Sequence, residues 1–175
     1  MTTVGMLPIK KWASTRLGFL LRLDMPDSQL QHTSPQLIMA FDFGTQKTGM
    51  AVGSSLIESA TPLALFPMKD GIPHWDELLK IVKQHQPTLF LVGLPLNMDD
   101  SESELSARAR KFARRLRHQT NIETWMVDER LTTREARDEL DHYQAQGRGK
   151  KISADSIAAA LFIESWYRHP EGMTP

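Results

Sequence analysis

The sequence lacks cysteine, long hydrophobic runs and an excess of charge of either sign. Without cysteine, the chain can form neither disulfide bonds nor a thiolate metal site, so any metal ion must bind to oxygen or imidazole ligands. The six histidines include no pair spaced four residues apart, which leaves a zinc site of the metalloprotease type without support. Lysine and arginine total 21, as do aspartate and glutamate, so the net charge gives no indication of a nucleic-acid partner.

The first 36 residues show no sustained hydrophobic periodicity. Their apolar stretch, Leu17 to Leu23, is interrupted by arginine and is far shorter than the roughly 20 residues of a transmembrane helix. No small-residue cleavage site of a signal peptide follows it. We therefore predict a flexible, dispensable extension over residues 1–36 and no membrane association. A single domain is expected over residues 37–168, with a short C-terminal tail over residues 169–175.

The hydrophobic pattern predicts a domain that mixes strands and helices. Apolar runs joined by short turns predict antiparallel strands over residues 37–43, 48–52 and 59–66, the last weakened by Pro62. Two buried strands are expected over 88–94 and 122–127, and helices over 75–85, 106–119 and 154–167, with a further helix that begins at Thr132. Capping boxes are predicted at Ser101 with Glu104 and at Thr132 with Glu135. This order predicts an α/β fold with a five-stranded mixed sheet, three strands antiparallel and two parallel, flanked by helices.

Asp42 stands at the end of the first predicted strand, on the same face as Ile38 and Ala40. Two interpretations fit Asp42, a turn-capping residue before Gly44 and Thr45 and a functional carboxylate, and the local sequence leaves both open. An Asp-x-Gly-Thr turn between strands resembles the phosphate loop of actin-like and sugar-kinase-like ATPases. It also resembles nucleases of the RNase H type, where the aspartate binds Mg²⁺. Those ATPases use two such domains and this chain has room for one, so we favour the nuclease.

A second acid, Asp155, lies in the first turn of the last predicted helix. The N-cap candidate, Ser153, stands two residues before it. It is in register with Ala159, Phe162 and Trp166, the stripe expected to pack on the sheet. A carboxylate on a core-facing stripe needs a metal ion or a basic side chain as its partner.

The third candidate follows the last predicted strand, in the segment Asp128-Glu129-Arg130. Neighbouring side chains at a strand end point in opposite directions, so at most one of these two acids is expected to join Asp42 and Asp155. We favour Glu129 and leave open that Asp128 forms a surface ion pair with Arg130. Three carboxylates from separate elements suit Mg²⁺ or Mn²⁺, and such ions could activate water for cleavage of a phosphodiester.

Four segments, in this order and spacing, resemble the YqgF family, also called RuvX-like: "FDFGTQKTGMAVG", "LVGLPLNMDDSESELSARARKFARRL", "VDERLTTREA" and "ADSIAAALFIESW". The resemblance covers nearly the whole predicted domain. It implies an RNase H-like fold and a cytoplasmic, metal-dependent nuclease that acts in 5′-end maturation of precursor 16S ribosomal RNA. The residue pattern described above predicts Mg²⁺ or Mn²⁺ as cofactor, Asp42, Glu129 and Asp155 as metal ligands, and Asp128 as a further catalytic candidate.

The resemblance leaves the substrate open. A nuclease of the Holliday junction resolvase kind and a non-catalytic nucleic-acid or ribosome-associated factor are the alternatives. The expected partners are precursor ribosomal RNA or branched DNA and ribosomal particles, and the expected state is a monomer or weak dimer. The expected substrate contacts include three residues within the motifs, Lys47, Asn97 and Arg130. The glycine-bearing loop "GRGKK" adds three more, Arg148, Lys150 and Lys151.

Two positions depart from the family pattern. Gln46 precedes Lys47 where a basic pair is usual, and Asp100 stands where a glycine is usual. Lys47 keeps one positive charge for a phosphate. The predicted helix over 106–119 carries six basic residues and no acid, which fits either a solvated face or a phosphate-binding one, and we rank the 147–151 loop above it.

Overall fold

The computed structural model of the chain describes residues 36–132 and 152–175, and the structural statements below concern these two ranges. Three predictions fall elsewhere. The N-terminal extension up to residue 35, the helix expected after Thr132 and the basic loop over residues 147–151 lie outside the described residues. The described residues all belong to one structural unit, Pro35–Pro175.

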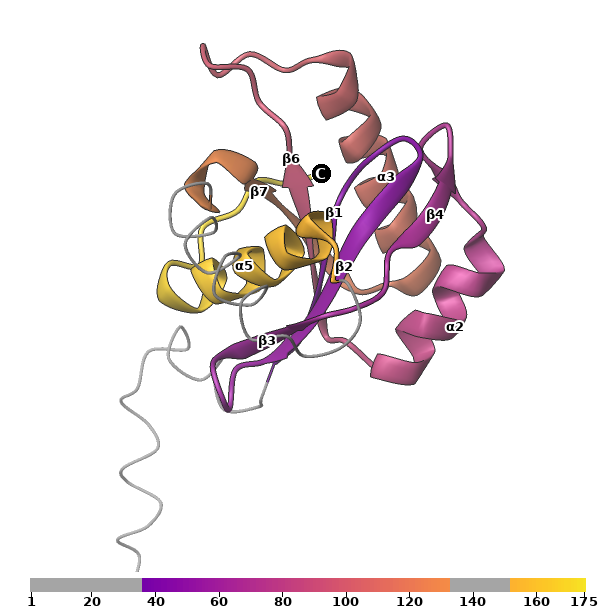
Figure 1. Cartoon of the computed structure of the whole chain (residues 1–175), viewed down its shortest axis with the longest axis vertical. Helices are drawn as coiled ribbons and strands as arrows, with labels where there is room; N and C mark the ends of the chain where they lie inside the picture. Colours follow the sequence, from indigo (N-terminus) through magenta and orange to yellow (C-terminus); the bar gives the residue numbers. More distant parts are fainter. Residues whose placement is uncertain (1–35, 133–151) are drawn as a thin grey trace, which may run out of the picture. The chain divides into compact units, whose positions relative to one another are not determined.

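Within the described residues, a single mixed sheet has the strand order β5-β4-β2-β1-β6-β7, with β3 also paired to β2 (Figure 1). Its strands are β1 (Leu37–Asp42), β2 (Lys47–Ser54), β3 (Ser59–Pro62), β4 (Phe66–Lys69), β5 (Ile72–Pro73), β6 (Leu89–Leu94) and β7 (Glu123–Asp128). β1 and β2 are antiparallel, and their register places Asp42 opposite Gly49. β6 is parallel to β1, and β7 is parallel to β6. The carboxyl ends of β1, β6 and β7 therefore meet at one edge of the sheet.

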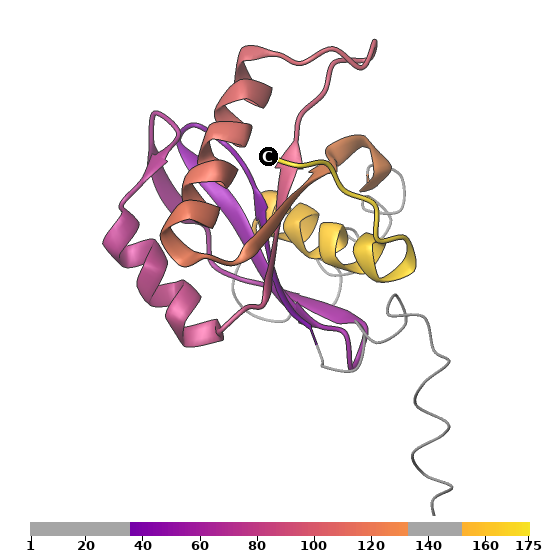
Figure 2. The ribbon, with the colours of Figure 1, turned by 180° about the vertical axis from the view of Figure 1, so that it is seen from behind.

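Helices cover both faces of this sheet. α2 (Trp75–His85) and α3 (Glu104–Thr120) pack on one face, and α5 (Ala154–Arg168) packs on the other, as Figures 1 and 2 show from opposite sides. None of the helices in the described ranges has the length and apolar character that a bilayer-spanning helix requires. The mixed sheet with flanking helices agrees with the predicted fold class.

The two faces of the sheet are packed differently. Under α2 and α3, the ring of Phe41 contacts the rings of both Phe90 and Phe112. Under α5, small residues such as Ala40 and Ala159 are fully buried. Small side chains let a helix lie close to the strands, so α5 can approach the end of β1.

The strand predicted over residues 59–66 differs from the observed sheet. It is split into β3 and β4, which pair with opposite ends of β2. Pro62 has no amide hydrogen, and the next residue, Leu63, donates its amide to the carbonyl of Met50 at 2.7 Å as the chain leaves β3. The short β5 then pairs with β4 as a further addition to the five predicted strands.

The start of α3 also differs from the prediction. Ser103, and not Ser101, is the N-cap: its hydroxyl accepts from the amide of Ser106, and the Ser106 hydroxyl accepts from the amide of Ser103. Ser101 instead donates its hydroxyl to Asp99 at 2.5 Å and accepts from the side-chain amide of Asn97 at 2.9 Å. Ser101 therefore forms hydrogen bonds within the loop before α3 and does not cap the helix.

The chain after α5 returns to the sheet. Met173 and Met126 of β7 form two backbone hydrogen bonds of 2.8 Å. Arg110 of α3 donates to the carbonyl of Thr174 at 2.5 Å. These contacts cover the outer edge of β7, which would otherwise present unpaired backbone groups.

Candidate active site

Three acids lie around the region where the carboxyl end of β1 approaches α5, and Asp42 interacts electrostatically with each of the other two. Asp42 is the last residue of β1, Glu129 begins the short 3-10 helix η2 (Glu129–Thr132) after β7, and Asp155 lies in the first turn of α5. Ile38 and Ala40, four and two residues before Asp42, both pack in the core under α5. Because side chains alternate along a strand, Asp42 also faces α5.

A glycine sets how closely α5 approaches the sheet. Gly49 lies opposite Asp42 in the β1–β2 ladder, and a Cβ atom on Gly49 would overlap the backbone carbonyl of Asp155. Any side chain at this position would push the start of α5 away from Asp42. Sequence reasoning missed Gly49, although a glycine inside a strand is a recognised signal of close backbone approach.

Lys47 is the basic partner of Asp155. Its Nζ lies 2.7 Å from Oδ2 of Asp155, and the two side chains are 55% and 33% exposed. Burial, and to a smaller extent repulsion from Asp155, raise the pKa of Asp42 to about 7, against the positive charge of Lys47, which lowers it. The charge on Lys47 therefore offsets only part of the electrostatic cost of holding these two acids together.

Glu129 belongs to the same electrostatic group. Burial raises the pKa of Glu129 most, and together with repulsion from Asp42 and then from Asp128 it brings this pKa to about 7. The Glu129 carboxylate lies against β6, where a Cβ atom on Gly93 would come within 2.7 Å of Oε1. Gly93 thus makes room for this carboxylate, and it is a second glycine that sequence reasoning missed.

Asp128 makes different contacts. Its carboxylate accepts from Nη2 of Arg130 at 2.7 Å and from the Arg130 amide at 2.9 Å, and these hydrogen bonds hold the pKa of Asp128 below its ordinary value. Arg130 also donates to the carbonyl of Asn97 at 3.1 Å and to the carboxylate of Asp100 at 2.6 Å. Arg130 therefore connects the end of β7 to the loop after β6. Two predicted substrate contacts, Asn97 and Arg130, meet in this network.

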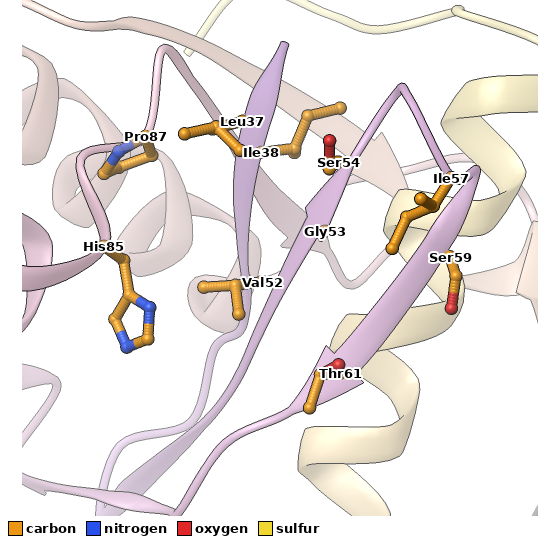
Figure 3. Close-up of a pocket in the computed structure, with 10 residues that line it drawn as sticks. All are labelled: Leu37, Ile38, Val52, Gly53, Ser54, Ile57, Ser59, Thr61, His85 and Pro87. Carbon is orange, nitrogen blue, oxygen red and sulfur yellow. The ribbon is translucent and has the colours of Figure 1, made fainter. Parts of the chain in front are cut away.

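The predicted basic residues of the 147–151 loop are outside the described residues. A pocket of about 230 Å³ lies at the opposite end of β1 from Asp42, lined by residues that include Leu37, Val52 and Ile57 (Figure 3). Its lining is mainly apolar and includes no acid, so it is separate from the candidate site.

The donor chemistry of Asp42, Glu129 and Asp155 suits a divalent cation that prefers oxygen ligands. Asp42 and Glu129 are partly buried carboxyls with raised pKa values and repelling neighbours, and a cation would stabilise their charged forms. Among the residues of the described ranges, no three acidic or histidine side chains already form a metal-binding group. The residues fit a divalent ion in their chemistry, and binding would require the Lys47–Asp155 ion pair to rearrange.

Comparison with known families identifies the group to which this arrangement belongs. A family model described as "RuvX: Holliday junction resolvase" matches residues 36–169. The chain belongs to the RuvX family. Its curated relatives are named as nucleases, which classes the chain with the hydrolases that cut phosphodiester bonds.

Two curated relatives and one solved structure show what this RuvX-family chain is similar to. An Acinetobacter baylyi protein named "Putative pre-16S rRNA nuclease" is 79% identical over 151 residues, which cover 86% of this chain and 100% of the relative. A Haemophilus ducreyi protein of the same name is 49% identical over 130 residues, covering 74% and 94%. The structure of T. thermophilus RuvC in complex with Holliday junction substrate matches with a TM-score of 0.54 at 14% identity, covering 78% of this chain and 98% of that chain. This likeness confirms the predicted RNase H-like fold.

Proposed function

We propose that this RuvX-family nuclease cuts precursor 16S ribosomal RNA, using Mg²⁺ or Mn²⁺ held by Asp42, Glu129 and Asp155. The observation that carries the proposal is the group of three acids from β1, η2 and α5, in which burial and mutual repulsion raise two pKa values to about 7. Burying repelling carboxylates costs folding free energy, so such a group supports a functional role rather than a structural one. The shared name of the relatives supports ribosomal RNA as the substrate.

A divalent ion bound there would polarise the scissile phosphate and lower the pKa of a water molecule. Asp42 and Asp155 would provide oxygen ligands across the contact between β1 and α5, and Glu129 would provide the third from η2. Lys47 is more than half exposed and would contact a phosphate oxygen of the substrate. Arg130 would hold the loop after β6 in place through its hydrogen bonds to Asn97 and Asp100.

A second candidate function is the cleavage of branched DNA. It is favoured by the description of the family model and by the fold shared with RuvC. A factor that binds nucleic acid without cutting it is the alternative from another functional class. We further propose a cytoplasmic location, contact with ribosomal particles, a monomer or weak dimer, and phosphate contacts by Arg148, Lys150 and Lys151.

The test compares the two substrates directly. The full chain is incubated with a precursor 16S ribosomal RNA fragment and with a four-way DNA junction, each with Mg²⁺, Mn²⁺ or EDTA. We expect metal-dependent cleavage of the RNA, which Asp42→Asn and Glu129→Gln abolish. Asp76→Asn removes one exposed acid from α2 and should cut as the wild type does. Cleavage of the junction alone would favour the second candidate, and binding without any cleavage would favour the non-catalytic factor.

A further inference from the structure

The exposed side of α3, which packs on the sheet face opposite α5, carries a dense set of positive charges. α3 contains six lysine or arginine residues and a single acid, Glu104, at its first position. Four of the six are exposed and form no ion pair with any described residue. These four residues, which we call the α3 basic face, are Lys111, Arg114, Arg115 and Arg117. The whole chain has a net charge of zero, so this face is a local concentration of charge and does not reflect the overall composition.

Acids near the start of α3 are already paired. Arg108 binds Asp70 and Glu104 at 2.6 and 2.8 Å, and Arg110 binds Glu102 at 2.6 Å. Arg114 contributes a weaker attraction to Glu102, after that of Arg110. Ion pairing therefore balances the first two turns of the helix and leaves the α3 basic face with little compensation.

The helix dipole explains only part of this charge. Basic side chains near a helix C-terminus interact favourably with the last carbonyl groups, which accounts for Arg117 in the last turn. The dipole effect falls off within about one turn, so it does not account for Lys111 and Arg114. A solvated face would also be expected to mix charges of both signs.

One member of the face is held in place. The Arg115 guanidinium lies 4.9 Å from the centroid of the Trp75 ring, and Trp75 in turn stacks on Phe112 with ring centroids 5.9 Å apart. A guanidinium stacked on an indole keeps its edge free to donate two parallel hydrogen bonds. Arg115 is therefore positioned in advance to bind an oxyanion.

We propose that the α3 basic face is a second nucleic-acid contact, which binds the phosphodiester backbone of the substrate outside the segment that is cut. Lys111 to Arg117 spans about 9 Å along the helix axis, enough for two to three phosphates at the roughly 3.4 Å axial spacing of one strand. Three of its four residues are arginines, which match phosphate geometry better than lysine does. This proposal rests on the proposed function only in taking the bound chain to be the nuclease substrate.

The position of the face defines what it can bind. α3 covers the sheet face opposite α5, so the basic face and Asp155 lie on different sides of the sheet (Figure 2). The loop before α3 is tied to η2 through Arg130, so α3 begins beside the candidate site and runs away from it. A short strand in the site would not reach the face, whereas a longer or structured nucleic acid would pass the start of α3 and lie along it.

The test measures binding without cleavage, in EDTA. The triple variant Lys111→Ala, Arg114→Ala and Arg117→Ala keeps Arg115 on Trp75 and places a strong helix former at three exposed positions. We expect it to bind a hairpin of about 30 nucleotides about 10-fold more weakly at low salt, with the salt dependence reduced by two to three counterions. Binding of a strand of about six nucleotides should be unchanged, because such a strand fills only the candidate site. Hairpins of one sequence, made of RNA or of DNA, show which of the two nucleic acids the α3 basic face binds.

A charge-matched control separates the face from net charge. Lys69→Ala, Lys80→Ala and Lys83→Ala together remove the same charge from exposed positions on β4 and α2. This control should change hairpin affinity less than twofold. An equal loss in the control, an unchanged salt dependence in the α3 variant, or a loss confined to the short strand would each overturn the proposal. A loss of affinity for polyglutamate or anionic vesicles with unchanged nucleic-acid binding would also overturn it. A wild-type protein that binds the hairpin through this face but never cuts RNA would support this proposal and contradict the proposed function.

Discussion

Replacing Asp42 by asparagine should stabilise the metal-free protein at alkaline pH. Raising the pKa of a carboxyl group from 3.8 to about 7 corresponds to about 4 kcal/mol of unfavourable free energy for its charged form in the native state. Asparagine keeps the size of the side chain and removes that charge. It also loses the attraction to Lys47, so we expect a net gain of about 1–3 kcal/mol in the free energy of unfolding at pH 8.

The pH dependence has a definite sign. Because the native pKa of Asp42 is higher than the unfolded one, the native state binds more protons between about pH 4 and 7. The stability of the wild type should therefore fall as pH rises through this window, and the penalty from Asp42 should be complete above pH 7. The advantage of Asp42→Asn should be largest at pH 8 and should vanish near pH 4.

The assay is urea unfolding in EDTA at pH 5 and pH 8, followed by tryptophan fluorescence, for the wild type, Asp42→Asn and the surface control Asp76→Asn. Removing the charge of Asp42 should also lower the pKa of Glu129, which NMR titration of the carboxyl resonance can follow. Millimolar Mg²⁺ or Mn²⁺ should stabilise the wild type and have little effect on Asp42→Asn. A variant no more stable than the wild type at pH 8, with the same pH dependence, would falsify the electrostatic argument.

Three further predictions concern the surrounding residues. Glu129→Gln should raise stability at pH 8 by about 1–3 kcal/mol in urea unfolding and abolish cleavage, whereas a stable variant that still cuts RNA would remove Glu129 from the site. Gly49→Ala should lower stability by about 1–3 kcal/mol and reduce cleavage, because its Cβ displaces the backbone of Asp155; an unchanged melting temperature would contradict that contact. Alanine at all three basic positions of the 147–151 loop should reduce the salt dependence of nucleic-acid binding by up to about three counterions without changing stability. An unchanged slope would assign that loop to solvent.

Much of the fold could be predicted from local pattern alone. Continuous apolar runs and helical spacing located β1, β6, β7 and the three described helices. A buried strand requires a run of apolar residues and a helix buried on one face requires apolar residues at helical spacing, whatever each packs against. The prediction of one strand over residues 59–66 was wrong, because the structure has two strands there. Its division into β3 and β4 depends on which end of β2 each half meets, and Pro62 alone does not specify that partner.

The candidate site shows the same division between local and tertiary information. The sequence by itself determined that Asp42 shares a face with Ile38 and Ala40, since strand alternation is a property of the backbone. Only the tertiary structure decided that Glu129 interacts with Asp42 while Asp128 turns to Arg130, because the chain leaves β7 in a 3-10 turn.

The closest approaches in the site were likewise decided by packing between segments distant in sequence. The Lys47–Asp155 ion pair joins β2 to α5 across more than 100 residues, and the overlap that any side chain on Gly49 would make is with that same helix. Periodicity reports which face a residue occupies but carries no information on which distant residue will lie opposite it. Distances between separate elements are set when those elements pack together, and so are the desolvation and charge repulsion that raise the pKa of Asp42.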